Sequence, residues 1–333
     1  MGPLEFLYYS GYCIKKSNDR RKQKRLPRRV ISVGNLTYGG TGKTPAVIAI
    51  AEDAKKAGYQ PCILTRGYKG RARGPCFISR GAGALLGVEE AGDEAVLMAE
   101  RLKGVPIVKC ADRYKGGMFA ISELPSQHPL LFILDDGFQH LRLYRDVDIL
   151  LIDGTNPFGN RRLIPSGILR EPLTEMKRAD LIVITKVSDS EKAIQSLIDE
   201  IRGYNPDKPI FLAEHRPVGL RTISGETLPP DFISGRAVLG FCAIGNPASF
   251  RGTLLRIGAE LKGFMSFRDH FMYSQQDIFR ISEAAGRCRA DWIVTTEKDI
   301  IKMKGIVVPE NLLSLCIEFD VDRRFYEEIL QEG

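Results

Sequence analysis

Residues 30–44 read Val-Ile-Ser-Val-Gly-Asn-Leu-Thr-Tyr-Gly-Gly-Thr-Gly-Lys-Thr, and this stretch decides the fold. A β-branched apolar run leads into a glycine-rich loop, and the apolar residues 46–51 that follow are typical of a helix. Strand, glycine loop and helix in this order make a phosphate-binding loop, because backbone N–H groups can turn inward where glycine removes the Cβ clash. The helix N-terminus adds partial positive charge. The stretch therefore predicts a P-loop NTPase-type α/β fold.

The loop supplies the candidate nucleotide-binding residues. Lys43 is expected to reach the β- and γ-phosphates of ATP, and the Thr44 hydroxyl to ligate Mg²⁺. Thr37 stands where the strict pattern G-x-x-x-x-G-K-[ST] has a glycine, and a glycine-rich turn that caps an ordinary helix is the alternative interpretation. The predicted cofactor-binding residues are Gly39, Gly40, Thr41, Gly42, Lys43 and Thr44.

Composition narrows the class of protein. The 333 residues are 44% hydrophobic and 27% charged, which is ordinary for a globular chain. The net charge of +7 suits an anionic partner such as a nucleotide, a nucleic acid or an acidic membrane surface. The seven cysteines form no C-x-x-C pair, which favours a reducing cytosol over a disulfide framework or a zinc site. No apolar run approaches the ~20 residues that span a bilayer.

The first 29 residues combine an apolar, aromatic segment with a basic one. Leu4, Phe6 and Leu7 open the segment, and nine basic residues then fall between Lys15 and Arg29. One interpretation is an interfacial helix that places its apolar side in a lipid surface and its basic residues on anionic headgroups. The other is a helix that packs on the domain, followed by a solvated basic linker. A secretory signal is excluded because its charge would precede the apolar stretch.

Short apolar runs bounded by turn residues predict a mostly parallel sheet flanked by helices. Asn205-Pro206 and Pro209 mark a boundary, so we expect a P-loop core at 30–205 and a second, smaller α/β part at 206–333 from which the core may take strands. Ligands of such sheets bind at the carboxyl ends of the strands. The expected strands are 30–36, 61–65, 106–110, 130–134, 147–152, 181–185, 210–213, 237–243, 292–295 and 313–319.

The apolar run 130–134 leads directly into Asp135-Asp136-Gly137-Phe138-Gln139-His140. A strand that ends in acid is how P-loop proteins hold Mg²⁺ opposite the loop threonine. With two carboxylates, one can hold the metal while the other accepts a proton. Two buried acids without cations would be costly, which favours a site over a plain turn.

Further candidates stand in loops and at expected helix starts. Each has a structural alternative: helix capping for the acids of Gly92-Asp93-Glu94, a surface turn for Arg66-Gly67-Tyr68, and a structural histidine at position 270. Thr185-Lys186-Val187-Ser188 only faintly resembles the guanine-reading [NT]-K-x-D motif, because Ser188 stands at the aspartate position. The remaining candidates are Arg66, Tyr68, Asp93, Arg113, Arg170 and His270.

Taken together, these segments resemble the tetraacyldisaccharide 4'-kinase family, the lipid A 4'-kinases of Gram-negative bacteria. The resemblance runs in family order from about residue 4 to the end of the chain, and in the family a threonine at position 37 is usual. It rests on residues 34–35, 39–45, 65–68, 92–94, 112–113, 135–140, 170–172, 269–270 and 296–299.

The resemblance implies transfer of the γ-phosphate of ATP to the 4'-hydroxyl of an acylated glucosamine disaccharide, at the cytoplasmic face of the inner membrane. It implies a peripheral protein with a membrane-associated N-terminal helix and no nucleic-acid partner. Asp93 is then the expected base, oriented by His270, with Asp136 as the reserve candidate. The expected metal ligands are Thr44, Asp135 and Gln139, and the expected substrate-binding residues are Arg66, Tyr68, Arg113, His140 and Arg170.

A P-loop nucleotide switch or partitioning-type ATPase is the rival interpretation. Its deviant loop resembles Gly-Gly-Thr-Gly-Lys-Thr, but the lysine that marks the group just before the glycine pair is Tyr38 here. A rate of ATP hydrolysis that does not change when lipid is added would favour this rival.

Overall fold

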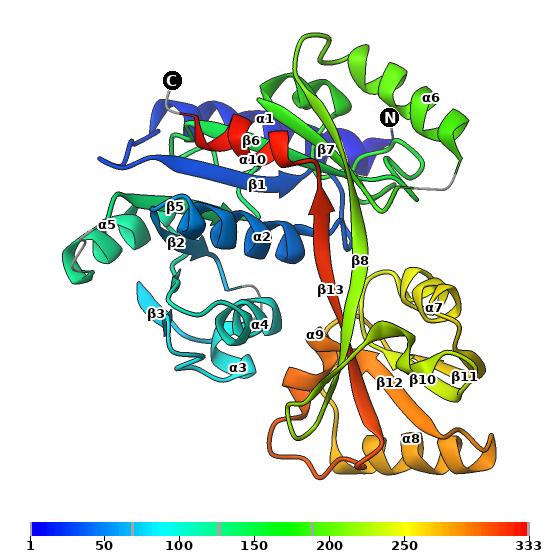
Figure 1. Ribbon diagram of the computed structural model, residues 1–333. Helices are drawn as coiled ribbons and strands as arrows, with labels where there is room; N and C mark the ends of the chain where they lie inside the picture. The colour runs from blue at the N-terminus through cyan, green and yellow to red at the C-terminus, as the bar shows by residue number, and fades with distance from the viewer. Residues whose placement is uncertain (1, 68–69, 125–127, 188–189, 332–333) are drawn as a thin grey trace. The chain divides into compact units, whose positions relative to one another are not determined.

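The structure is a computed structural model that describes residues 2–67, 70–124, 128–187 and 190–331 (Figure 1). The chain divides into two compact units, which we describe separately. Unit 1 holds residues up to His215 together with those from Phe319 onward, and unit 2 holds Arg216–Glu318. Strands β8 (Ile210–Thr222) and β13 (Leu312–Val321) each contain residues of both units.

Unit 1 is built on a mostly parallel sheet, as the sequence predicts. Its strand order is β8-β7-β6-β1-β5-β2-β4-β3, in which the described residues pair in parallel from β8 to β4 and antiparallel between β4 and β3. The strands are β1 (Val30–Asn35), β2 (Gln60–Thr65), β3 (Cys76–Arg80), β4 (Pro106–Lys109), β5 (Leu130–Asp135), β6 (Val147–Asp153) and β7 (Leu181–Thr185). The helices are α1 (Pro3–Arg21), α2 (Lys43–Lys56), α3 (Val88–Ala91), α4 (Asp93–Arg101), α5 (Arg113–Glu123), α6 (Glu191–Arg202) and α10 (Arg323–Leu330), with a 3-10 helix η1 (Leu173–Arg178).

Burial explains why the central strands read as continuous apolar runs. Every residue of β1, β5 and β6 is buried, because helices cover both faces of a parallel sheet. Alternate side chains of one strand enter one core cluster, as Leu130, Phe132 and Leu134 of β5 do. Ile182 and Ile184 of β7 enter a second cluster.

The parallel register brings the ends of these strands to one edge. Val33 of β1 is level with Asp135 of β5, so the glycine loop and the acidic segment begin side by side. A Cβ on Gly34 would lie 2.6 Å from Cβ of Phe138, so glycine is needed at this close approach. The sheet therefore places the P-loop and Asp135-Asp136 together before any side-chain contact is considered.

Unit 2 is a smaller α/β unit with the parallel strand order β11-β10-β12-β13. Its remaining elements are β9 (Thr227–Leu228), β10 (Ala237–Cys242), β11 (Glu260–Ser266), β12 (Trp292–Thr296), α7 (Pro247–Arg256), α8 (Gln275–Arg287), α9 (Glu297–Ile300) and two 3-10 helices, η2 (Pro230–Ile233) and η3 (Ile301–Met303). The sequence analysis did not predict β11, whose residues are exposed or half-buried because it is an edge strand.

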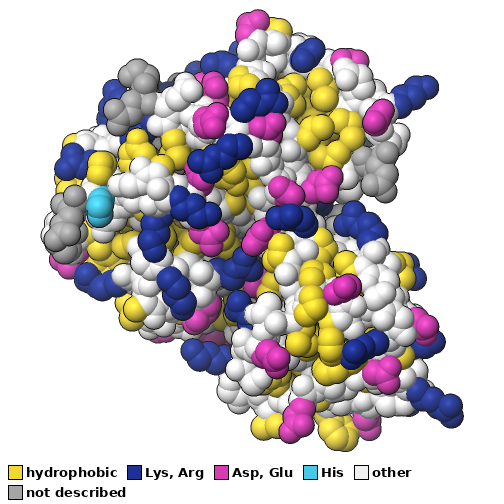
Figure 2. All heavy atoms as spheres, in the orientation of Figure 1, with side chains coloured by type: hydrophobic (Ala, Val, Ile, Leu, Met, Phe, Trp, Pro, Cys, Tyr) yellow, Lys and Arg dark blue, Asp and Glu magenta, His cyan; other side chains and the backbone are white. Residues whose placement is uncertain are grey.

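The surface carries charges of both signs. On the face drawn in Figure 2, Lys and Arg side chains are interspersed with Asp and Glu side chains. On this face the basic side chains are therefore mixed with acidic ones and are not gathered in one patch.

A buried ion pair organises the interior of unit 2. The Lys302 ammonium lies 2.7 Å from the Asp299 carboxylate, and neither side chain has exposed surface. Asp299 also accepts hydrogen bonds from the Tyr273 hydroxyl at 3.1 Å and from the backbone N–H of Ala243. The segment 296–299, part of the family resemblance, thus holds β10 to β12 and α9 within unit 2.

We expect Lys302→Met to destabilise unit 2 by about 3 kcal/mol, because it leaves Asp299 as an uncompensated buried charge. Trp292, the one tryptophan of the chain, lies on β12 and reports unit 2 unfolding in urea by fluorescence. The matched control is Lys262→Met, which breaks the exposed pair with Glu260 and should leave the midpoint unchanged. Equal midpoints for both variants would contradict the structural role of Lys302.

Candidate active site

The glycine loop lies between β1 and α2, with Gly42 immediately before the first helical residue, Lys43. Gly42 has φ +83°, and a Cβ there would lie 2.4 Å from Nε2 of His215. Backbone conformation and space therefore both require glycine at this position.

Residues at the ends of β6 and β7 hold the loop through its backbone carbonyls. The Thr185 hydroxyl donates to the carbonyl of Thr41 at 2.9 Å, and the Lys186 ammonium donates to the carbonyl of Gly40. Lys186 is itself paired with Asp153 at 2.6 Å. These bonds fix the carbonyls of Gly40 and Thr41, and the Thr41 N–H donates to the carbonyl of Gly39 at 3.1 Å, so the loop is ordered by the protein itself.

Lys43, Asp136 and Arg170 form the charged centre of the site. Lys43 Nζ lies 3.2 Å from Oδ1 of Asn35 and 3.6 Å from Oδ1 of Asp136. Arg170 Nη1 lies 2.9 Å from both carboxylate oxygens of Asp136. Partial burial alone would raise the pKa of Asp136, but Lys43 and Arg170 outweigh it and hold the pKa below its usual range. Asp136 is therefore ionised and held between two cations.

Gln139 belongs to the same network. Its amide nitrogen donates to the carbonyl of Asn35 at 2.8 Å, and its amide oxygen accepts from Arg170 at 3.2 Å. The Arg170 guanidinium also lies 4.8 Å from the centre of the Tyr38 ring. Both ends of the Gln139 amide are therefore engaged by the protein.

Asp135 stands in a different environment from its neighbour. It is buried, Oδ2 accepts a hydrogen bond from the Thr65 hydroxyl at 2.9 Å, and Oδ1 has no hydrogen-bond partner among the described residues. Burial, followed by the charges of Glu94 and Asp136, raises the pKa of Asp135 to about 6. A buried carboxylate oxygen without a donor among the described residues, on a group close enough to Lys43 of the loop to be affected by its charge, fits an oxygen-ligated divalent cation.

Arg113 lies near the two acids, and His140 lies near Arg113. Arg113 is buried at the start of α5, where burial lowers its pKa while Asp135 and Asp136 act in the opposite direction. Burial and then Arg113 lower the pKa of His140 to about 4, so the imidazole is neutral at pH 7. Its Nε2 is buried and has no hydrogen-bond partner in the described part of the chain.

The remaining predicted residues fall in three places. Arg66 is exposed after β2 and close enough to Arg113 to disfavour its charge, and Tyr68 lies outside the described residues. Asp93 is buried at the start of α4, where one carboxylate oxygen accepts from the N–H of Glu94 at 2.9 Å. His270 belongs to unit 2, with φ +61° and Nε2 3.6 Å from the Asp269 carboxylate. Asp93 and His270 thus come from different units.

Several residues of the site were not predicted from the sequence, and three of them are instructive. Thr65 holds Asp135, Lys186 holds the loop, and Lys109 is buried with its ammonium donating to the carbonyl of Glu90 at 2.5 Å. Each stands at the end of a parallel strand or directly after it. That position was the available signal, since polar side chains at strand ends face the ligand edge.

Known proteins resemble this chain over nearly its whole length. The family model described as tetraacyldisaccharide-1-P 4'-kinase matches residues 1–332. The tetraacyldisaccharide 4'-kinase of Syntrophus aciditrophicus is 38% identical over 319 residues, which cover 92% of this chain and 84% of the relative. That of Desulfotalea psychrophila is 36% identical over 334 residues, covering 99% and 94%. A crystal structure of LpxK from Aquifex aeolicus in complex with ATP matches with a TM-score of 0.76 and 35% identity, covering 98% and 96%.

The two adjacent acids predict opposite effects on stability. The pKa of Asp135, about 6, exceeds the ~4 of an unfolded aspartate, so the unfolded chain loses this proton first and stability falls as pH rises from about 4 to about 6. In EDTA at pH 7.5, Asp135→Asn should therefore raise the free energy of unfolding by up to about 3 kcal/mol, which is seen as a higher Tm, and this gain should shrink toward pH 5.

Asp136→Asn is the matched control, since its ionised form is stabilised by Lys43 and Arg170. It should lower Tm at pH 7.5, and differential scanning calorimetry measures both variants. If both substitutions lower Tm equally, the proposed contrast between the two carboxylates is wrong.

Proposed function

The chain belongs to the tetraacyldisaccharide-1-P 4'-kinase family, and from this premise we propose that it transfers the γ-phosphate of ATP to the 4'-hydroxyl of tetraacyldisaccharide 1-phosphate, in lipid A biosynthesis. It is a phosphotransferase that uses ATP with Mg²⁺. The observation that carries the proposal is the shared edge of β1 and β5, where Lys43 of the P-loop lies 3.6 Å from Asp136.

The nucleotide roles follow from charge. The amides of residues 39–44 and Lys43 hold the β- and γ-phosphates, whose transferring group passes through a loose transition state that needs positioning and charge balance. Thr44 and Asp135 would hold Mg²⁺, which when bound would offset negative charge on the phosphates. Gln139 is the third proposed ligand. To bind the metal, its amide oxygen would have to give up the hydrogen bond that it accepts from Arg170.

The acceptor hydroxyl needs a base, and we assign this role to Asp93 with His270 orienting it. Asp136, the reserve candidate, is a weak base because Lys43 and Arg170 hold its pKa low. Its role is to fix those two cations around the phosphoryl group. A sugar hydroxyl is a poor acid, so a positioned base contributes about 10²–10⁴-fold.

The acceptor is bound by cations and hydrogen-bonding groups around the same edge. Arg113 is buried near Asp135 and Asp136 and is shielded from water. Its guanidinium would therefore be stabilised by a phosphate group of the acceptor. Neutral His140 offers a buried Nε2 to a sugar hydroxyl. Arg66, Tyr68 and Arg170 complete the proposed binding set.

We propose that the outer surface of α1 contacts the anionic cytoplasmic face of the inner membrane. Leu4, Phe6, Leu7 and Ile14 are each more than 60% exposed, although apolar side chains of this size favour burial. Exposed basic residues follow at 20–25. Among the described residues, no helix has the length and hydropathy to cross a membrane, which fits attachment at the interface.

The kinase assay is thin-layer chromatography of γ-labelled ATP with tetraacyldisaccharide 1-phosphate in mixed micelles. We expect label in the lipid, and Asp93→Ala should lower kcat by about 10²–10⁴-fold while ATP still binds. Glu100→Ala, which removes an exposed acid from the same helix, is the control and should retain wild-type turnover. A rate of ATP hydrolysis that does not change when lipid is added would support the nucleotide switch instead. Near-normal turnover in Asp93→Ala would reject Asp93 as the base.

Membrane attachment is tested by sedimentation with anionic vesicles. Leu7→Ser with Ile14→Ser removes two apolar side chains worth about 1.5–3 kcal/mol each when buried, so the bound fraction should fall more than tenfold. Leu85→Ser removes a comparably exposed leucine elsewhere in unit 1 and should leave binding unchanged. Equal binding of all three proteins would rule out the outer surface of α1 as the contact.

A further inference from the structure

The inner side of α1 is polar, which a membrane anchor alone does not require. Glu5 and Asp19 are buried, and Tyr8, Tyr12 and Lys16 are half-buried, whereas the large apolar side chains point outward. Burying polar and charged groups is unfavourable unless they meet partners. The partners of this inner side are therefore informative.

Those partners are the segments that carry the catalytic side chains. The Tyr8 hydroxyl donates to the backbone carbonyl of Arg170, whose guanidinium holds Asp136. Residues of α1 and of the segment that follows it make further hydrogen bonds to backbone carbonyls at 139–142, shortly after Asp136. They run from Lys15 to the carbonyl of Gln139 at 3.5 Å, from the Gln23 side chain to that of Leu141 at 2.9 Å, and from the Lys24 N–H to that of Arg142 at 2.8 Å.

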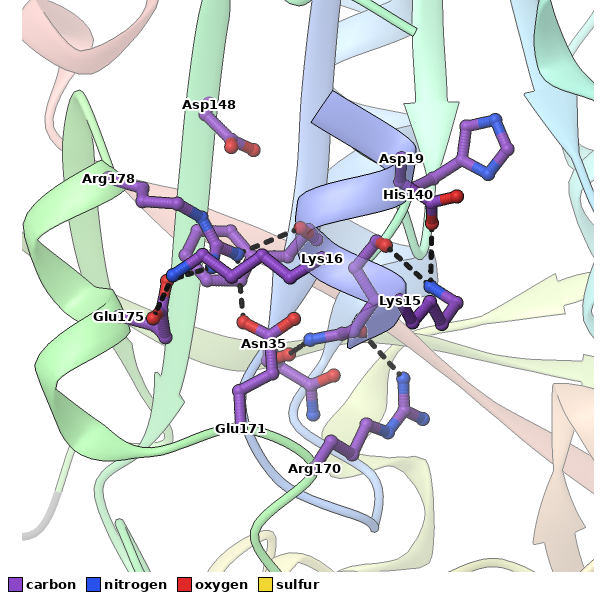
Figure 3. Close-up of polar contacts among 12 residues, drawn as sticks. Lys15, Lys16, Asp19, Asn35, His140, Asp148, Arg170, Glu171, Glu175 and Arg178 are labelled. Carbon is purple, nitrogen blue, oxygen red and sulfur yellow. Dashed lines mark hydrogen bonds and ion pairs between the residues drawn. The ribbon is translucent and has the colours of Figure 1, made fainter. Parts of the chain in front are cut away.

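A buried charge network makes the second connection (Figure 3). Lys16 of α1 pairs with Glu175, which also pairs with Arg178. Arg178 is bound to Glu171 at 2.8 Å, donates to the carbonyl of Phe138 at 3.0 Å, and lies 4.3 Å from the centre of the Phe138 ring. The Arg178 side chain is 8% exposed, so these bonds are shielded from water.

We infer that the inner side of α1 positions the catalytic loop 135–142, with Lys16 and Tyr8 as positioning residues, in addition to the lipid contact of the outer side. This inference rests on the proposed kinase function. The two sides of one helix then have separable effects: the outer side sets how much enzyme meets lipid, and the inner side sets turnover.

The geometry explains why turnover should respond. Phe138 lies between Asp136 and Gln139, and its backbone carbonyl and ring are both held by Arg178. Without Lys16, Glu175 keeps Arg178 as its one remaining cation in this network, which draws Arg178 away from Phe138. A displacement of about 1 Å at a catalytic group costs up to about 100-fold in rate.

The test measures kcat, KM for the lipid and vesicle binding for the full-length protein. Lys16→Met and Tyr8→Phe should lower kcat between about 10- and 100-fold while the vesicle-bound fraction stays at the wild-type value. Leu7→Ser with Ile14→Ser should do the reverse. Lys16→Arg, which keeps the charge, should restore kcat. All assays are run well below the Tm of each variant, so unfolding does not enter.

Amide hydrogen exchange at residues 137–142 provides a readout that does not depend on the reaction. Lys16→Met should accelerate exchange there, and Lys16→Arg should not. Wild-type kcat in Lys16→Met, or a lower kcat with unchanged exchange at 137–142, would overturn the inference. A wild-type protein that fails to label the lipid would instead reject the proposed function, and the exchange result would still decide whether α1 orders the loop.

Discussion

The site depends on one constraint: two acids at the end of a buried strand must find positive charge. The register of β1 and β5 places Asp135 and Asp136 beside the P-loop. They stand at the end of strands whose side chains lie in the apolar core, where the dielectric constant is low. Asp136 meets Lys43 and Arg170 within the protein. Among the described residues, Asp135 accepts one hydrogen bond, from the Thr65 hydroxyl, and burial followed by the charges of Glu94 and Asp136 raises its pKa. We propose that a metal-bound nucleotide supplies the positive charge that Asp135 lacks.

Much of this arrangement could be predicted from sequence, and the exceptions have a physical pattern. Central strands such as the one predicted at 130–134 and observed at Leu130–Asp135 could be predicted because burial on both faces leaves an uninterrupted apolar signal. Edge strands such as 260–266 were missed because half-exposed residues carry no such signal. The loop and the acids were predicted because each is a contiguous motif. Thr65 and Lys186 were missed because each is a single residue whose partner is distant in sequence.

The helix α1 shows that sequence patterns alone do not determine which side of a helix packs against the protein. Its sequence mixes apolar, aromatic and charged residues, and the two interpretations of an interfacial helix and a packed helix were both left open. The structure shows that it packs on unit 1: Glu5 bonds to the N–H of Leu163, and Asp19 to the Arg142 guanidinium. Packing of the polar side leaves the apolar side exposed, so the two interpretations are compatible. Sequence alone cannot reveal this, because which side turns inward depends on partners more than a hundred residues away.

The contrast between the acids also assigns the chemistry. A general base must hold a proton weakly enough to give it up and strongly enough to take it. Asp136 fails the second condition, since Lys43 and Arg170 stabilise its ionised form. Asp135 binds protons more readily, but a bound cation would displace the proton and occupy the free oxygen. The base is therefore best sought outside the acidic pair, and Asp93, buried at the start of α4, is the carboxylate that the family resemblance points to.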